Sequence, residues 1–86
     1  MTTWRAKLHQ SLGYAGETWA DVEYSTLTDT QLDTSFDDGW GSEEGCPFTV
    51  WTKTRVYFPA CYDGSEWVAS VARNPDGKPT GHVGGG

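Results

Sequence analysis

An Asp63-Gly64 dipeptide between two segments rich in β-forming residues constrains the fold more than any other feature of this chain. Asp-Gly suits the tight two-residue turn that joins antiparallel strands, because the central residues of that turn need a positive φ. We therefore expect residues 55–60 and 66–72 to form a β-hairpin. The turn also sets its register, in which the predicted pairs are Val56 with Val71, Phe58 with Ala69, and Ala60 with Trp67.

Residues 48–52 predict a third strand, joined to the hairpin by an even-length turn centred on Lys53-Thr54. This turn would place Val50 opposite Tyr57, Trp51 opposite Val56, and Cys46 opposite Cys61. Pro59 lies inside the middle strand and lacks the amide hydrogen that a ladder uses, so it predicts a bulge or an early strand end.

Strand alternation divides the apolar side chains of this sheet between two faces. One face would carry Trp51, Val56, Phe58, Trp67 and Val71, and the other would carry Phe48, Val50, Tyr57 and Val68. Because both faces are apolar, we expect a helix to cover one and the N-terminal segment to cover part of the other.

The N-terminal part of the chain has two less regular segments. Residues 2–12 fit a helix, with Trp4, Leu8 and Leu12 at helical spacing, and also fit a strand through simple alternation; we favour a short helix. Residues 18–26 are rich in β-forming residues and predict an extended segment at a sheet edge.

Thr28 and Gln31 form a capping-box pattern, which predicts that a helix begins here. Leu32 and Phe36 follow at a spacing of four, and Gly39 could end the helix after two to three turns. On this helix Asp29, Asp33 and Asp37 would lie along one face, about 6 Å apart.

The negative charge of the chain is concentrated in one stretch. Between Glu17 and Glu44 there are nine carboxylates and no Lys or Arg, whereas the residues from 45 onward contain three acids and four bases. Like charges gathered in one stretch repel each other and lower stability, so we interpret this stretch as a surface for a basic partner. The net charge of -6 argues against direct binding to nucleic acid or to anionic membranes.

No catalytic or metal-binding pattern is evident. Cys46 and Cys61 could be free thiols, a disulfide, or metal ligands with His9 and His82; the first is favoured, because no zinc-type spacing is present. The acids around Gly39 do not match an EF-hand loop. No nucleophile lies beside a base in the sequence, and no phosphate-binding glycine loop occurs. We therefore expect a protein that is not an enzyme and uses no cofactor or metal.

Length and composition indicate one domain. Eighty-six residues with twelve aromatic side chains can bury one modest core. We expect a single α+β domain at residues 1–79, with an antiparallel sheet of three or more strands and a short acidic helix, followed by a flexible Gly-rich tail at 80–86. No stretch is long and apolar enough to span a membrane and no secretory signal is evident, so we expect a cytoplasmic protein.

A short, acidic, single-domain chain with a carboxylate cluster between residues 17 and 44 and no catalytic signature resembles the small inhibitors that bacteriophages encode against host defences, including anti-CRISPR proteins and DNA mimics. The resemblance implies a basic nucleic-acid-binding effector as the partner, for instance a CRISPR-Cas component in the host cytoplasm, and a monomeric inhibitor. The residues that would contact it are Asp29, Asp33, Asp37, Asp38, Trp40, Glu43 and Glu44, with Trp40 filling a pocket.

Two other functions fit the sequence. A structural or assembly subunit, for instance of a virion, could bury its apolar sheet faces against copies of itself. A sugar-binding protein could use exposed Trp side chains. The aromatic residues in Gly-flanked loops, Tyr14 and Trp40, are the ones that we expect to be partly exposed.

Overall fold

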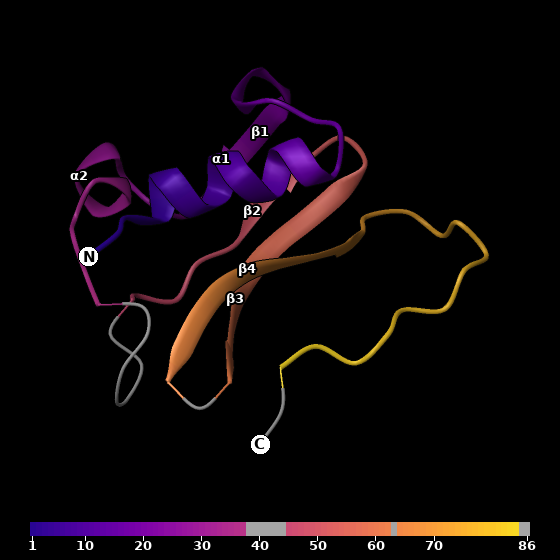
Figure 1. Ribbon diagram of the computed structural model, residues 1–86. Helices are drawn as coiled ribbons and strands as arrows, with labels where there is room; N and C mark the ends of the chain where they lie inside the picture. The colour runs from indigo at the N-terminus through magenta and orange to yellow at the C-terminus, as the bar shows by residue number, and fades with distance from the viewer. Residues whose placement is uncertain (38–44, 63, 85–86) are drawn as a thin grey trace.

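The computed structural model describes residues 1–37, 45–62 and 64–84. Within them, an antiparallel sheet of four strands in the order β1-β2-β3-β4 is accompanied by one main helix and a shorter one (Figure 1). The elements are α1 (Trp4–Tyr14), the 3-10 helix η1 (Trp19–Asp21), β1 (Val22–Ser25), α2 (Asp29–Leu32), β2 (Val50–Thr52), β3 (Arg55–Tyr62) and β4 (Ser65–Ala72). The predicted α+β class is confirmed.

The predicted strand register is confirmed in both ladders. β3 and β4 pair Val56 with Val71, Phe58 with Ala69, and Ala60 with Trp67. β2 and β3 pair Val50 with Tyr57 and Trp51 with Val56. Gly64, with a φ of 83°, adopts the left-handed conformation that a tight hairpin turn needs at this position.

Pro59 does not interrupt β3, so the predicted bulge or early strand end is wrong. The Arg73 amide donates to the Thr54 carbonyl at 2.9 Å, which marks a hydrogen-bonded position of the hairpin. Such positions recur at every second residue of an antiparallel pair, so Pro59 falls at a position that does not bond to β4. Its other side faces no strand, because β2 begins only at Val50. The missing amide hydrogen therefore leaves no ladder bond unmade.

The N-terminal segment is helical, as favoured from its spacing. The Thr3 hydroxyl accepts from the Ala6 amide at 3.2 Å and so caps the first turn of α1. Trp4, Leu8 and Leu12 lie along one side of α1 and are at most 1% exposed. They pack on the sheet face that carries Val50 and Tyr57, and this contact is the centre of the hydrophobic core.

Both helices belong to the same core, so the expectation that the two sheet faces would be covered separately is wrong. Leu32 of α2 and Phe36 join the side chains of α1 on the face of Phe48, Val50 and Tyr57. The rings of Phe36 and Phe48 lie 4.7 and 4.8 Å from that of Trp4. Among the residues that the structure describes, no helix covers the opposite face.

α2 is a single turn, which corrects the predicted helix of two to three turns. Its capping box forms as expected, because the Gln31 amide donates to the Thr28 hydroxyl and the Thr28 amide donates to the Gln31 side chain. The helix ends after Leu32 because Phe36 pairs instead with Thr2, through two backbone hydrogen bonds of 2.9 and 3.0 Å. This pairing places Phe36 in the core, and the proposed helical row of three carboxylates does not form. Gly39 lies outside the described residues.

β1 is an edge strand, in agreement with the extended segment predicted for residues 18–26. It is shorter than that segment, because residues 19–21 form η1. The Asp21 carboxylate accepts from the Thr18 amide at 2.8 Å and holds this turn in place. β1 pairs with β2 with an irregularity between Val22 and Tyr24.

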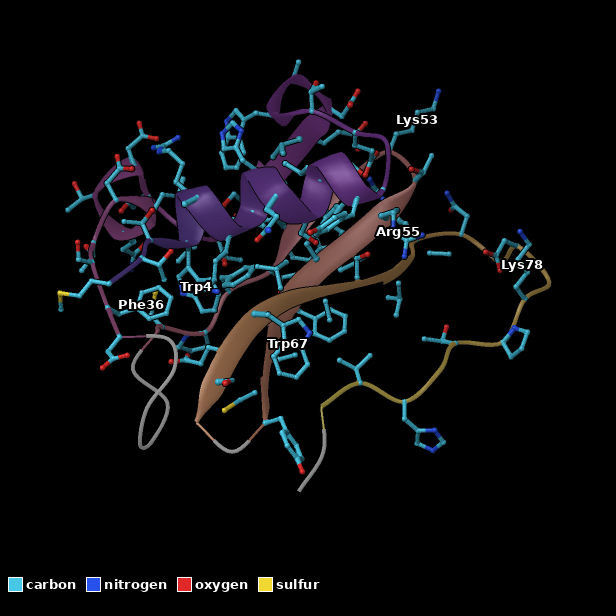
Figure 2. All side chains as sticks on the ribbon, in the orientation of Figure 1. Trp4, Phe36, Lys53, Arg55, Trp67 and Lys78 are labelled. Carbon is cyan, nitrogen blue, oxygen red and sulfur yellow. The ribbon has the colours of Figure 1, made fainter. Side chains whose placement is uncertain are left out.

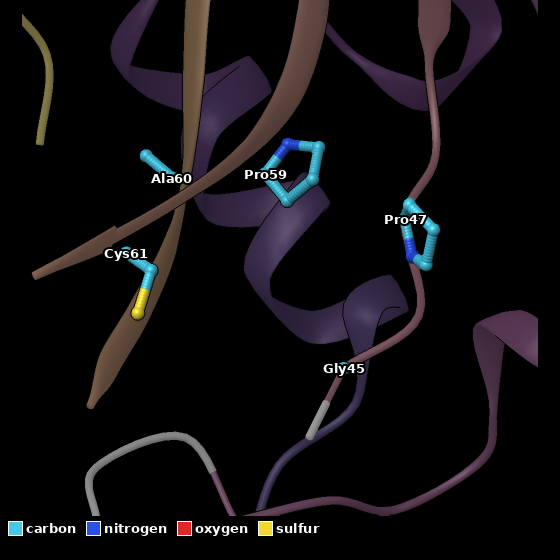
Figure 3. A pocket seen from close by; sticks show the side chains of 5 residues that line it. All are labelled: Gly45, Pro47, Pro59, Ala60 and Cys61. Atoms are coloured by element: carbon cyan, nitrogen blue, oxygen red, sulfur yellow. The ribbon is translucent and has the colours of Figure 1, made fainter. Parts of the chain in front are cut away.

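Cys46 and Cys61 are free thiols, the favoured alternative of the three. The predicted pairing of Cys46 with Cys61 does not form, because β2 starts at Val50 and residues 45–49 leave the ladder. A pocket lies between the segment of Gly45 and Pro47 and the end of β3 at Pro59, Ala60 and Cys61 (Figure 3). Pro47 and Pro59 lie where residues 45–49 separate from β3. Neither proline has an amide hydrogen that could form a hydrogen bond between the two segments.

Gly45 is fixed by a close approach to α1. A Cβ atom at this position would lie 2.5 Å from the Trp4 indole ring, which is itself held by a hydrogen bond of 3.0 Å from Nε1 to the Cys46 carbonyl. The Gly45 amide also donates to the buried Glu66 carboxylate at 3.1 Å. No side chain fits here without moving the core.

We predict that Gly45→Ala lowers the free energy of unfolding by roughly 1–3 kcal/mol, because the added methyl group overpacks the Trp4 site. Urea denaturation followed by Trp fluorescence measures the loss. Gly13→Ala is the matched control: no atom lies within 4 Å of its added Cβ, and Ala favours the helix by about 0.5–1 kcal/mol. Equal stability of Gly45→Ala and the wild type would contradict this packing.

Candidate functional site

The predicted acidic surface contains an arginine bridge. Arg5 of α1 donates through Nε to Asp33 at 2.6 Å and through Nη2 to Asp29 at 3.2 Å. The two carboxylates lie four residues apart, one in α2 and the other at its C-terminal cap. The hydrogen bond from Arg5 lowers the pKa of Asp33 and keeps it ionised further into acid. Arg5 therefore links α2 to α1 and compensates part of the expected charge.

The carboxylates of this bridge remain in contact with solvent. The side chain of Asp29 is 94% exposed and that of Asp33 is 58% exposed. Two negative charges share one guanidinium, so the pair keeps a net negative charge. Asp37 lies half-buried beside Phe36. The remaining predicted contacts, namely Asp38, Trp40, Glu43 and Glu44, lie outside the described residues.

Glu17 forms hydrogen bonds within the protein that could not be predicted from the sequence. Gly16, with a φ of 76°, ends α1 in the left-handed conformation, and the Glu17 amide donates to the Leu12 carbonyl at 2.8 Å. The Glu17 carboxylate then accepts hydrogen bonds from three hydroxyl groups of the β2–β3 hairpin. The donors are Thr52 at 3.1 Å, Thr54 at 3.2 Å and Tyr57 at 2.5 Å. This carboxylate thus connects the end of α1 to the sheet.

Glu23 also has an internal partner. Arg73, just after β4, donates to Glu23 at 2.6 Å and to the Thr52 carbonyl at 2.8 Å. Tyr24 and Trp51 lie next to this ion pair, with ring centroids 5.5 Å apart, and the four side chains line a shallow pocket. Tyr24 is 63% exposed, so the pocket opens to solvent.

The pocket continues into the sheet face opposite α1, which we call the outer face and define by Tyr24, Trp51, Val56, Phe58, Trp67 and Val71. Its strand side chains, apart from the exposed Tyr24, are only half-buried, whereas Val50 and Tyr57 on the helix side are fully buried. The outer face is therefore an apolar, ring-rich surface with partial access to water. Tyr14 is 84% exposed, as predicted, but it is the last residue of α1 and does not lie in a loop.

Three cations have no carboxylate partner among the described residues: Lys53, Arg55 and Lys78. Arg5 and Arg73, in contrast, both form ion pairs. Figure 2 places the three at the end of the molecule opposite Trp4 and Phe36. The cations that remain available for an external ligand therefore lie away from the Asp29 and Asp33 carboxylates.

No catalytic arrangement is evident among the described residues. The ring of His9 stacks on Trp19 at 5.3 Å, with Arg5 against the same indole at 5.6 Å, which is a packing role. No group of three or more His, Cys, Asp or Glu side chains in this part of the chain could hold a metal ion. The longest helix has 11 residues, and none of those described could cross a lipid bilayer.

Comparison with known proteins gives no relative from which a function could be transferred. No protein-family model, curated protein or solved structure matches the chain. Functional arguments for this molecule therefore rest on its own residues.

The Glu17 site predicts that the free energy of unfolding decreases at alkaline pH. Burial raises the pKa of Tyr57 above its usual value near 10, and the hydrogen bond to Glu17 raises it further. Because the unfolded chain ionises first, the contribution of the Tyr57 hydroxyl is complete below pH about 10 and is lost as the pH rises beyond it. Tyr57→Phe should lower the free energy of unfolding by roughly 1.5–3 kcal/mol at pH 7 and by less above pH 10.

Urea denaturation between pH 7 and pH 11 measures this difference. Tyr62→Phe is the matched control, because it removes a hydroxyl group from a side chain that is 53% exposed. A constant difference between wild type and Tyr57→Phe over this pH range would contradict the role given to the hydroxyl.

Proposed function

We propose that this protein is a non-enzymatic binding protein that blocks a basic, nucleic-acid-binding partner by covering its positively charged surface. The observation that supports it is the excess of carboxylates between Glu17 and Glu44. That stretch holds nine carboxylates and no Lys or Arg, and the ion pairs of Arg5 and Arg73 involve three of them, Asp29, Asp33 and Glu23. Such a surface attracts clustered Lys and Arg, and these are the groups that nucleic-acid-binding proteins present.

The carboxylates between Glu17 and Glu44 differ in whether they can bind a partner. Glu17 and Glu23 are bonded within the sheet and Asp33 is tied to Arg5, so these side chains mainly hold the fold. Asp29 is almost fully exposed and can exchange its contact with Arg5 for one with a partner. Asp38, Glu43 and Glu44 supply further charge, and Trp40 a large apolar side chain. A CRISPR-Cas effector in the host cytoplasm is one partner of this chemistry.

The proposal predicts salt-dependent binding with a fast association step, because exposed charges act mainly on the association rate. The test is a variant that combines Asp29→Asn, Asp38→Asn, Glu43→Gln and Glu44→Gln, assayed for capture of basic proteins from a host lysate and for release of nucleic acid from the captured protein. At about 0.2–1 kcal/mol for each charge that the variant removes, binding should weaken roughly tenfold.

The matched control is Asp63→Asn with Asp76→Asn, which removes two charges outside the stretch and keeps a residue suited to the turn at position 63. The control should capture the same protein as the wild type. Capture by the fourfold variant at full strength, or a captured protein that keeps its nucleic acid, would contradict the proposal.

The outer face favours assembly as a second candidate function. A half-exposed surface with four aromatic side chains suits association between copies, because apolar burial drives it. Tyr24→Lys would place a charge at the exposed end of this face. Thr30→Lys, at an exposed position of α2 on the helix-covered side of the sheet, is the control. If copies assemble, sedimentation at micromolar concentration will show an oligomer that only Tyr24→Lys dissociates. A monomeric wild type would exclude assembly and fit the inhibitor.

A further inference from the structure

The chain after β4 turns back toward β3 (Figure 1). A groove lies between this returning segment and the strands β3 and β4. A Cβ atom on Gly84 would lie 3.2 Å from the Cys61 carbonyl, so this segment ends against β3. The groove measures about 430 Å³, which is in the size range of small-molecule sites. Arg55 and Ser70 line it from the sheet, and Lys78, Thr80 and His82 line it from the returning segment.

Arg55 is held in the groove by its neighbour on β4. Its Nε donates to the Ser70 hydroxyl at 2.9 Å and its Nη2 donates to the Ser70 carbonyl at 3.2 Å. A guanidinium has five N–H groups, so most of its donors remain for another acceptor. The side chain is half-buried, which makes an unpaired charge more costly than at a fully exposed site.

Arg55 has no carboxylate partner among the described residues, although the chain is rich in acids. The chain has twelve acids for six Lys and Arg, yet neither Arg55 nor Lys78 pairs with an acid among the described residues. Asp76 also lines the groove, but its carboxylate accepts from the Lys78 amide at 2.9 Å and so stabilises the turn. The groove is therefore lined by two cations, Arg55 and Lys78, and by one carboxylate, Asp76, so its net charge is positive.

We propose that this groove binds a small molecule that carries a phosphate group. Arg55 would supply paired N–H donors to two phosphate oxygens, as guanidinium groups do with oxyanions, and Lys78 would add a second charge. The Thr80 hydroxyl and the His82 imidazole provide further polar contacts. Val71, Pro79 and Val83 line the same groove and suit the organic part of the molecule.

The ligand is a small molecule and not a nucleic acid strand. A strand needs a row of cations along its backbone, and the net charge of -6 repels a polyanion. A single phosphate needs only the local charge of Arg55 and Lys78. The groove is also separate from the surface that we propose for a basic partner, so each proposal can be tested without the other.

Titration of the full chain with phenyl phosphate, followed by NMR of the backbone amides at constant ionic strength, tests the proposal. The expected result is saturable shifts at residues 70–72 and 78–83. Lys78→Met should weaken the binding about threefold to fivefold, and Arg55→Met more than about tenfold. Lys53→Met removes an equally unpaired cation outside the groove lining and should leave the affinity unchanged.

Three results would overturn the proposal. The first is the absence of saturable shifts in these residues, which would show that the groove does not bind the phosphate. The second is equal weakening by Lys53→Met and Lys78→Met, which would show general charge attraction. The third is tighter binding of a twelve-nucleotide single strand than of phenyl phosphate at the same amides, which would identify the groove as a nucleic acid contact. Because Lys78 is exposed, its substitution keeps the test valid if Arg55→Met fails to fold.

Discussion

The packing of α1 on one face of the sheet is the interaction on which the rest of the structure depends. Trp4, Leu8 and Leu12 meet Val50 and Tyr57, and all five are at most 1% exposed. Among the described residues only α1 is longer than a single helical turn, so only one face receives such a cover. Because no described helix covers the other face, the outer face stays half-exposed. The small core also leaves the loops to be held to the sheet by side-chain hydrogen bonds and ion pairs.

Polar contacts around the core attach the remaining segments to α1 and the sheet. Arg5 joins α1 to α2, Glu17 joins the end of α1 to the β2–β3 hairpin, and Arg73 joins the end of β4 to β1. Each uses a carboxylate of the acidic stretch. Part of that stretch is therefore structural, and its effect on a partner comes from the carboxylates that remain exposed.

The sheet could be predicted from the sequence because the turn residues and the strand alternation that define it lie close together in the chain. The Asp63-Gly64 turn and strand alternation fixed the pairs of Val56 and Tyr57, and helical spacing identified α1. The end of α2 could not be predicted, because it depends on Phe36 pairing with Thr2, far away in the sequence. The Arg5 bridge and the three hydroxyl donors to Glu17 were missed for the same reason: each joins residues from separate elements. The unpaired state of Arg55 is likewise visible only in three dimensions.

Separation of charge underlies both the proposed partner surface and the proposed phosphate groove. Paramagnetic NMR with cationic and anionic nitroxide cosolutes measures the electrostatic potential near each backbone amide. We predict a negative potential at residues 29–37 and a positive one at residues 53–55 and 78–82. A potential of the same sign at both sets of amides would contradict the account.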